Sequence, residues 1–594
     1  MRNTRSNKNR KDSQLNRRDI LKLGALAGAG ATASLLGMHA TAYAEGDGPS
    51  ILSREDAAEL SADGLEEASI VGLQAAMSSG QLSAKTLTER YIKRIKKIDQ
   101  NGPALNSVLE LNPDALKIAK ELDEERKKRG PRGPLHGIPI LLKDNIDTGD
   151  KMQTTAGSLS LVGAPASADA TVAKRLRDAG AIILGKTNLS EWANTRANFS
   201  SSGWSGRGGQ THNPYIVDRN PCGSSSGSAV AVSASLCAAA LGTETDGSIT
   251  CPAHMTGIVG IKPTVGLVSR AGVIPVSHTQ DTVGPHGRTV ADAAAVLGAL
   301  VGIDPRDAAT QDSTGKFYTD YTQFLNPNGL QGARIGVPRT SDFFGYNAYI
   351  DDIIEKAIVA MRNAGAIIVD PANLPSNNEW LTDNAETVVL VYEFKRDLNA
   401  YLATRTGVPV RSMADVIAFN EANADRELQF FDQGFMELAQ NEAFSDADYQ
   451  AALMRSRDIG RTRGIDAVMD QYQLDALVAP LTSPAWVTDL LYGDRFQGAS
   501  TSPAAMAGYP LVTVPAGYVQ GLPVGINFMG RAYSEPTLIK LAYAFEQVTR
   551  ARQVPKYLPT MPVADPSLGR LPRHKNNGAD VQAQQRTPVR MHGR

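Results

Sequence analysis

The chain has 594 residues, of which 42% are hydrophobic and 21% charged, a balance typical of an ordinary globular enzyme. The chain has 61 basic and 62 acidic residues. Residues 1–44 contain eight of the basic and two of the acidic residues, so the rest of the chain has 53 basic and 60 acidic residues and a net charge of −7. That balance gives no reason to expect nucleic-acid binding, and no stretch after residue 44 is apolar enough to predict a membrane span.

Residues 1–44 have the pattern of an export signal. The stretch 16–22, NRRDILK, resembles a twin-arginine motif, a weakly apolar segment follows at 23–37, and Ala-Tyr-Ala at 42–44 predicts cleavage before Glu45. We therefore expect export through the twin-arginine machinery, which moves folded proteins, to the periplasm or beyond. The alternative is a charged, disordered arm with a short helix.

Alternating helix and strand patterns follow the leader. Apolar residues recur at helical spacing between 51 and 125, and residues 137–142 have the pattern of a strand. A helix at 171–179, a strand at 181–184 and a helix that opens at 188–193 continue the alternation. Such alternation predicts an α/β protein with a largely parallel sheet covered by helices on both faces.

Lys143 ends the apolar run of the first of these strands. A lysine serves as a base near pH 7 only when it is neutral, and an exposed lysine has a pKa of about 10.4. The apolar residues 138–142 would remove water from Lys143 and so lower its pKa. Adjacent residues of a strand point to opposite faces, so we expect Asp144 to have a structural role.

A Ser- and Gly-rich centre lies between residues 221 and 249. Residues 223–228 hold four serines in six positions and are expected to form a loop, whereas the apolar run 229–241 predicts a buried helix whose first N–H groups face that loop. The chain then reaches the turn 245–248, where the backbone N–H groups of Thr245, Asp246 and Gly247 are candidates for stabilising an oxyanion. The preceding loop is expected to wall the site, with Trp204 as a substrate contact or a buried plug.

Three motifs in this order, HGIPILLKDNID, NPCGSSSGSAV and GTETDGSI, resemble the amidase signature family, and the resemblance extends over residues 70–550. It implies a serine hydrolase with a Ser/cis-Ser/Lys triad, in which Ser248 is the nucleophile, Ser224 the bridging serine after a cis peptide bond, and Lys143 the base. It also implies a mixed central sheet layered by helices. Within the family, the motifs look most like those of bacterial peptide amidases.

Two residues depart from the commonest family pattern. Cys222 and Asp246 stand where glycine is frequent, and neither change removes a backbone donor. A carboxylate that pointed inward from Asp246 would oppose an oxyanion. We therefore expect this side chain to turn away, toward a substrate N–H or the departing ammonia.

Cysteine and histidine residues add little to this pattern. The cysteines are odd in number and lie in the serine loop, the expected helix and the segment after Ser248, which argues against a disulfide framework for Cys222, Cys237 and Cys251. Cys237 is expected to pack in the core. Structural or surface roles are expected for His254, His278 and His286, and no His/Asp/Glu cluster has the ligand spacing of a metal site.

The second half of the chain adds helices before the sheet resumes. Residues 376–459 are mostly helical in pattern, and we expect either a cap over the active site or a helical layer remote from substrate. Strand patterns at 334–337, 474–480 and 509–518 and a helix at 536–551 complete one amidase domain over 45–560. Residues 561–594 lose the apolar periodicity and are rich in Pro, Gln, Asn and Arg, which predicts a disordered basic tail.

Other reaction classes fit the sequence less well. Ser225 lies in a G-x-S-x-G sequence, but no buried strand precedes it as in an α/β-hydrolase, and no Gly-Lys-Ser/Thr marks a phosphate loop. The expected function is hydrolysis of a carboxamide, foremost the C-terminal amide of a peptide, to a carboxylic acid and ammonia by a monomer without cofactor or metal. Two alternatives stay open: a broad-specificity amidase for aliphatic or aryl amides, and a non-catalytic or partner-bound amidase-like subunit.

Overall fold

The computed structural model describes residues 64–377, 379–498 and 500–562. The predictions for the export signal, and for the tail beyond residue 562, lie outside these residues. Within them the strands are β1 (Val108–Leu111), β2 (Pro139–Lys143), β3 (Ile182–Thr187), β4 (Trp204–Ser205), β5 (Gly209–Gln210), β6 (Ala239–Glu244), β7 (Val259–Lys262), β8 (Thr282–Gly287), β9 (Arg334–Gly336), β10 (Ile367–Val369), β11 (Ala476–Pro480), β12 (Leu511–Val519) and β13 (Leu522–Met529).

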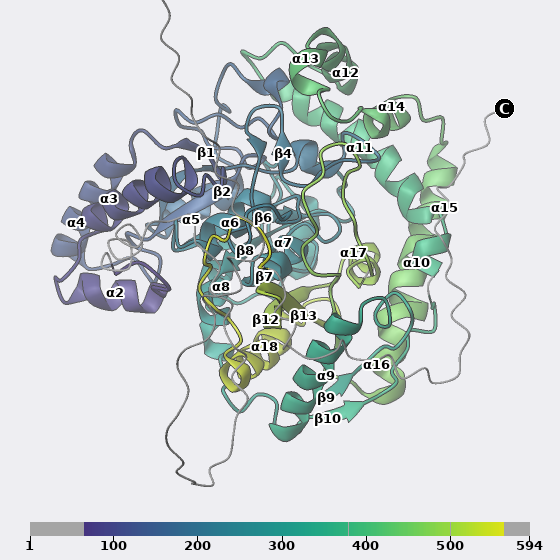
Figure 1. The fold of residues 1–594 in the computed structure, drawn as a ribbon. Helices are drawn as coiled ribbons and strands as arrows, with labels where there is room; N and C mark the ends of the chain where they lie inside the picture. Colours follow the sequence, from purple (N-terminus) through teal and green to yellow (C-terminus); the bar gives the residue numbers. More distant parts are fainter. Residues whose placement is uncertain (1–63, 378, 499, 563–594) are drawn as a thin grey trace, which may run out of the picture. The chain divides into compact units, whose positions relative to one another are not determined.

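Eleven of these strands form one sheet in the order β1-β3-β2-β6-β8-β7-β12-β13-β11-β9-β10 (Figure 1). The strands β3, β2 and β6 run parallel to one another, as do β11, β9 and β10, whereas the strands between the two groups pair antiparallel. The sheet is therefore mixed, as the family resemblance implies. Its parallel group places the C-terminal ends of β2 and β6 side by side, with Leu142 opposite Leu241.

Helices pack on both faces of the sheet. Those outside the helical insertion are α2 (Ile70–Ser78), α3 (Ala84–Arg94), α4 (Ala115–Arg129), α5 (Thr171–Asp178), α6 (Ser226–Ser233), α7 (Thr250–Met255), α8 (Val290–Leu300), α9 (Ala348–Asn363), α16 (Asp466–Tyr472), α17 (Ser502–Ala507) and α18 (Glu535–Thr549). Side-chain caps mark several of their starts. At α8, for example, the Thr289 side chain accepts from the N–H of Asp292.

Neighbouring residues of β8 point to opposite faces of the sheet, and their contacts show which helices lie on each face. A Cβ placed on Gly242 of β6 would lie 2.7 Å from Ser225 Oγ, beside α6, and 2.9 Å from His286 Cε1 of β8. The next residue of β8 faces the opposite way, because a Cβ on Gly287 would lie 2.8 Å from the Ala293 nitrogen of α8. Helices α6 and α7 therefore cover one face, and α8 with α18 covers the other.

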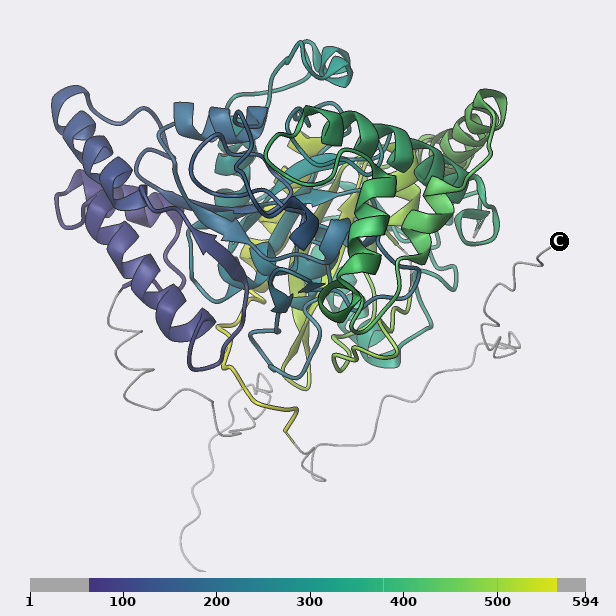
Figure 2. The same cartoon turned by 90° about the horizontal axis from the view of Figure 1, so that it is seen from above.

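The helical insertion, residues 376–459, contains α10 (Glu379–Thr382), α11 (Ala385–Thr404), α12 (Met413–Ala422), α13 (Ala424–Glu427), α14 (Gly434–Gln440) and α15 (Asp446–Arg457). Figure 2 shows these helices, in green, away from the purple N-terminal helices α2–α4. The hydroxyl of Tyr401 in α11 donates to Asp147, in the loop that follows β2. The buried Glu427 accepts from the N–H of Leu159. The insertion thus touches loops close to Lys143, and its role as a cap stays a prediction.

Four assignments made from the sequence are wrong. Residues 226–228, expected to be loop, form the first turn of α6. The apolar run 229–241 is not one helix, because α6 ends at Ser233, Ser235 adopts a left-handed backbone with φ 54°, and the run continues into the central strand β6. That strand is buried on both faces, so it lacks the alternation that distinguishes a strand from a buried helix. The region 51–125 also contains strand β1, and residues 188–193 form only a short 3₁₀ turn over Glu191–Asn194.

No helix within the described ranges is long and apolar enough to cross a membrane.

Candidate active site

Lys143 stands at the C-terminal end of β2 and is fully buried. Its Nζ donates to Ser224 Oγ at 2.8 Å, to Thr243 Oγ1 at 2.8 Å and to the Thr243 carbonyl at 3.3 Å. Burial lowers the pKa of Lys143 from 10.5 to about 7, although the carboxylates of Asp281 and Glu244 oppose that shift. A neutral amine is therefore accessible near neutral pH, as a lysine base requires.

The neighbouring Asp144 makes its contacts elsewhere. Its carboxylate accepts from the Thr155 hydroxyl and forms an ion pair with Arg207, at 3.2 Å from Nη1 to Oδ2. Arg207 also pairs with Glu110 at 2.6 Å. These contacts tie three segments of the chain together, which is the structural role expected for Asp144.

The serine loop enters α6 through a cis peptide bond between Gly223 and Ser224, as the family resemblance implies. A Cβ on Gly223 would lie 2.2 Å from Ser190 Oγ, so a larger residue here would displace the Ser190 side chain. Ser225 is engaged with the sheet, because its Oγ donates to the Thr243 carbonyl at 3.1 Å and accepts from the Thr243 N–H at 3.2 Å. This engagement argues against Ser225 as the rival nucleophile.

Ser248 lies in the turn after β6, beside the serine loop. Its carbonyl accepts from the Ser225 N–H at 3.1 Å, which places its backbone next to that of Ser224. Among the described residues Ser248 Oγ has no hydrogen-bond partner, and the residue is 8% exposed. The structure therefore joins Lys143 to Ser224 directly and Ser248 to the loop through its backbone. Catalytic hydrogen bonds are often long in ligand-free enzymes and tighten when substrate binds.

The turn before Ser248 carries the three predicted oxyanion donors. The backbone N–H groups of Thr245, Asp246 and Gly247 donate to no acceptor in the described part of the chain, so they remain available to a ligand. The Asp246 carboxylate accepts from Ser502 Oγ at 2.7 Å, at the start of α17. Burial raises the pKa of this carboxyl group above its ordinary value.

Glu244, at the end of β6, fixes the other side of the same turn. Its buried Oε2 accepts from the N–H of Ile249 at 2.7 Å and from that of Thr250 at 2.9 Å. These are the first N–H groups of α7, so the carboxylate holds the helix that follows Ser248. Sequence reasoning missed this residue, although an acidic residue inside a run of small and apolar residues is a signal that could have identified it.

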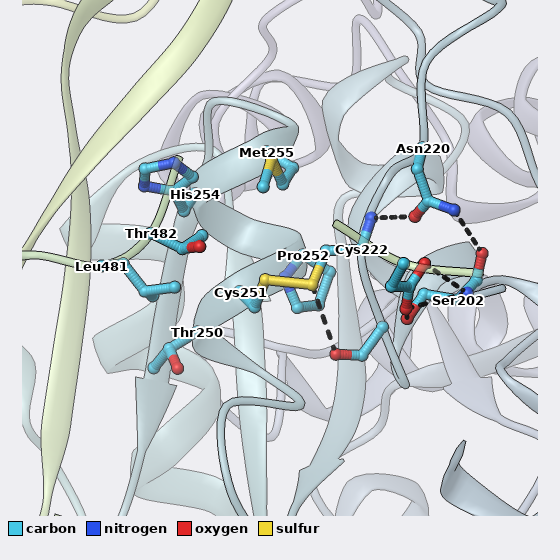
Figure 3. The surroundings of a disulfide bond; sticks show 12 residues. Ser202, Asn220, Cys222, Thr250, Cys251, Pro252, His254, Met255, Leu481 and Thr482 are labelled. Atoms are coloured by element: carbon cyan, nitrogen blue, oxygen red, sulfur yellow. Dashed lines mark hydrogen bonds between the residues drawn. A yellow bond between two sulfur atoms is a disulfide. The ribbon is translucent and has the colours of Figure 1, made fainter. Parts of the chain in front are cut away.

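A disulfide joins Cys222 to Cys251, with 5.9 Å between the Cα atoms, and this corrects the expectation that the cysteines are unpaired (Figure 3). An odd number of cysteines excludes only complete pairing. Here the fold brings together the serine loop and helix α7, at cysteines 29 residues apart in the sequence, while Cys237 stays free and buried. Burial raises the pKa of the Cys237 thiol to about 12, in agreement with a packing role.

A cavity of about 190 Å³ opens beside the partners of Lys143. Its lining includes Asn145, Thr243 and Thr245, whose side chains border the site, and Arg270 and Asp281 on the opposite segment. Asn145 Nδ2 donates to Thr243 Oγ1 at 3.0 Å, and Thr245 Oγ1 donates to Asp281 at 2.6 Å. Apolar side chains from residues 273–276 also line the cavity, together with the charged groups of Arg270, Asp281 and Asp397.

Trp204 is a buried plug and is not exposed to a ligand. Its ring packs edge-on against Phe430 and Phe431 of the insertion, and the Arg196 guanidinium lies 4.9 Å from its centroid. The loop 200–220 is thereby fixed to the insertion.

Structural or surface roles for the three histidines stay a prediction, and His278 also lines the cavity. His254 and His286 are buried, and burial lowers the pKa of each to about 4. His278 is half exposed and lies between two carboxylates, with Nδ1 2.8 Å from Asp397 and Nε2 3.5 Å from Glu393. One possible ligand atom from each of His278, Glu393 and Asp397 lies within 4.8 Å of the other two, and these residues form the only such group among the described residues. The two carboxylates face opposite nitrogens of one ring, an arrangement that fits an ion-pair network better than a shared metal.

Comparisons with known proteins show the family to which the chain belongs. The family model described as Amidase matches residues 86–539. The chain is 43% identical over 502 residues to "Probable amidase At4g34880" of Arabidopsis thaliana, covering 83% of this chain and 92% of that protein. It is 34% identical over 512 residues to a glutamyl-tRNA(Gln) amidotransferase subunit of Halorhodospira halophila, covering 83% of this chain and 99% of that protein.

Among solved structures, the native peptide amidase from Stenotrophomonas maltophilia superposes with a TM-score of 0.78 at 52% identity, covering 82% of this chain and 98% of that chain. A peptide amidase bound to the competitive inhibitor chymostatin gives a TM-score of 0.79 at 53% identity, with 82% and 99% covered. The chain therefore belongs to the amidase family, the amidase signature enzymes, and is a hydrolase that acts on amide C–N bonds.

Proposed function

We propose that this amidase removes the C-terminal carboxamide of peptides, with Ser248 as nucleophile, Ser224 as proton relay and Lys143 as base. The observation that carries the proposal is the fully buried Lys143 amine, 2.8 Å from Ser224 Oγ, in the loop whose next residue donates to the Ser248 carbonyl. An amine with a pKa of about 7 that is hydrogen-bonded to a serine can accept a proton through that serine, as activation of a nucleophilic hydroxyl requires.

The proposed reaction proceeds in two halves. Neutral Lys143 accepts the Ser224 proton while Ser224 Oγ takes the Ser248 proton, and Ser248 Oγ bonds to the amide carbon. The N–H groups of Thr245, Asp246 and Gly247 stabilise the negative oxygen of the tetrahedral intermediate. The C–N bond breaks as the proton returns through Ser224 to the nitrogen, and ammonia departs. Water then attacks the acyl ester by the same relay and releases the carboxylic acid.

The preference for peptide amides is supported by two observations. The peptide amidases are over 50% identical to this chain across 82% of its length, whereas the amidotransferase protein is 34% identical. Asp246 also places a carboxylate beside the donors of the turn, and its Oδ1 is buried without a hydrogen-bond partner among the described residues. A peptide carries N–H groups for such an acceptor, while a simple aliphatic amide carries none beyond its own carboxamide.

Ammonia release from a matched panel tests the proposed substrate class. The panel holds a C-terminally amidated dipeptide, the same dipeptide with an N-methylated backbone amide, an aliphatic amide and an aryl amide. The proposal expects the amidated dipeptide to have the highest kcat/KM and the N-methylated one to fall by at least about tenfold. Equal rates on all four amides would favour a broad-specificity amidase, and no turnover of any would favour a non-catalytic role.

We also propose export by the twin-arginine route, on the basis of NRRDILK at 16–22. A periplasmic or secreted location would distinguish this amidase from a cytoplasmic, partner-bound amidotransferase component.

A further inference from the structure

The disulfide lies between the two segments that hold the proposed nucleophile and its relay. Cys222 directly precedes the Gly223–Ser224 bond, and Cys251 follows Ser248 by three residues. On the loop side, the Cys222 N–H donates to Asn220 Oδ1 at 2.8 Å, and its carbonyl accepts from Ser226 Oγ at 2.6 Å. On the helix side, the Cys251 N–H donates to the Gly247 carbonyl at 2.7 Å. Each sulfur is thus attached to a short, internally bonded segment.

The disulfide is packed within a buried apolar cluster. Cys222 is fully buried and Cys251 nearly so, and they pack with the buried side chains of Tyr215, Ile216, Met255, Leu481, Ala485, Trp486, Leu522 and Leu558. Figure 3 shows Met255 and Leu481 on the α7 side of the bond and Asn220 on the loop side. A shift of either cysteine would therefore move the segment attached to it and not be absorbed by the surroundings.

Without the disulfide, few bonds fix the distance between the two segments. The backbone bond from the Ser225 N–H to the Ser248 carbonyl, at 3.1 Å, joins them directly. Ser225 Oγ fixes the loop to β6 through Thr243, and Glu244 fixes α7 to the end of β6. The last two contacts hold each segment to β6, and Ser233 Oγ of α6 donates to the Thr256 carbonyl after α7 at 2.6 Å. None of these bonds joins Ser224 Oγ to Ser248 Oγ.

We infer that Cys222 and Cys251 are positioning residues, whose bond holds Ser224 and Ser248 at the separation that proton transfer requires. The inference rests on the proposed roles of the two serines. Formation of the bond removes two electrons and two protons from the two thiols, and another disulfide accepts them by thiol–disulfide exchange. Such bonds persist in oxidising compartments. We therefore expect this disulfide to form after the chain has left the cytoplasm, in line with the proposed export.

The test compares enzyme with and without the bond at a temperature well below unfolding. The variants are the double substitution Cys222→Ser and Cys251→Ser, which keeps both side chains close in volume, and Cys237→Ser as the matched control for loss of a buried sulfur. Wild-type protein made under reducing conditions is a second bond-free form. Alkylation after rapid unfolding verifies three free thiols in the reduced form and one in the oxidised form, since the chain has three cysteines.

Positioning predicts a kcat at least about tenfold lower in both bond-free forms, with KM changed by less than about threefold. Oxidised glutathione restores kcat to the reduced wild type and not to the double variant, while Cys237→Ser keeps wild-type kcat. A kcat within twofold of wild type in the folded bond-free forms would overturn the inference. So would loss of the native thermal transition in both forms, because the bond would then serve stability alone.

Failure of the proposed function gives a different pattern. In that case oxidised wild type hydrolyses no amide, or activity survives Ser248→Ala, whatever the state of the disulfide. If oxidised wild type is active and Ser248→Ala is inactive, the bond-free forms report on positioning alone.

Discussion

The environment of Lys143 predicts a specific pH dependence of catalysis. Burial lowers its pKa from 10.5 to about 7, so about half of the amine is neutral at pH 7, compared with about one molecule in three thousand at a pKa of 10.5. Because the base must be neutral, kcat/KM should rise about tenfold per pH unit below 7 and become level above about pH 8. Replacement by methionine, Lys143→Met, keeps the length of the side chain, removes the amine and should abolish turnover.

The lowered pKa of Lys143 also predicts how the free energy of unfolding depends on pH. The unfolded chain holds the Lys143 proton up to about pH 10.5, whereas the folded chain loses it near pH 7. The unfolded state binds more protons in this window, so the free energy of unfolding rises with pH between 7 and 10.5. At pH 7 the shift costs on the order of 4 kcal/mol, which Lys143→Met removes, less the value of its hydrogen bonds.

The assay measures ammonia release from an amidated dipeptide between pH 5.5 and 9, and urea unfolding at pH 7 and pH 10, for wild type and Lys143→Met. Lys186→Met is the matched control, because Lys186 is also fully buried, with a pKa lowered by burial, and donates to Ile146 and Thr154 outside the site. It should change stability and leave the pH profile of turnover in place. A wild-type kcat/KM that stays level from pH 5.5 to 8 would refute the reasoning, as would a Lys143→Met enzyme with wild-type turnover.

Two further predictions rest on single contacts, and a third rests on the sequence motif at residues 16–22. Asp246→Asn should lower kcat/KM for the amidated dipeptide more than for an aliphatic amide, and unchanged turnover on every amide of the panel would contradict the role given to this carboxylate. The hydrogen bond to Asp397 and the charge of Glu393 raise the pKa of His278, so its contribution to stability is complete below the unfolded pKa near 6.5 and disappears as the pH rises through the higher folded value. Chemical unfolding should show a larger loss for His278→Gln at pH 5.5 than at pH 9, and equal losses would exclude the ion pair. Replacement of Arg17 and Arg18 by lysine should leave the full-length chain in the cytoplasm, as cell fractionation would show, and undiminished export would reject the twin-arginine signal.

The sequence was sufficient to predict the elements that carry local signals. The strand that ends at Lys143 follows an apolar run and could be recognised from composition, whereas the polar residues 226–228, expected to be loop, form the first turn of α6. The run 229–241 could not be divided correctly, because α6 and the central strand β6 are both buried on all sides and their apolar content is the same. The left-handed turn at Ser235 separates them, and a serine at this position does not by itself signal such a turn.

The candidate site shows the same division between local motif and long-range contact. Lys143, Ser224 and Ser248 could be named because each lies in a motif of known spacing. Their supporting contacts could not, since Thr243 meets Lys143 from 100 residues away and the Cys222–Cys251 pair forms only when the serine loop and α7 converge. Such pairings depend on sheet order, and the sequence pattern alone does not determine which strands are neighbours.

Turnover by Ser248→Ala tests the central claim most directly. Ammonia release from the amidated dipeptide is measured for wild type, Ser248→Ala and Ser225→Ala, each with a native thermal transition. The account predicts that Ser248→Ala is at least about a thousandfold slower than wild type, while Ser225→Ala retains measurable turnover. A Ser248→Ala enzyme that keeps wild-type turnover, or a folded Ser225→Ala enzyme that alone is inactive, would place the nucleophile elsewhere and contradict the account.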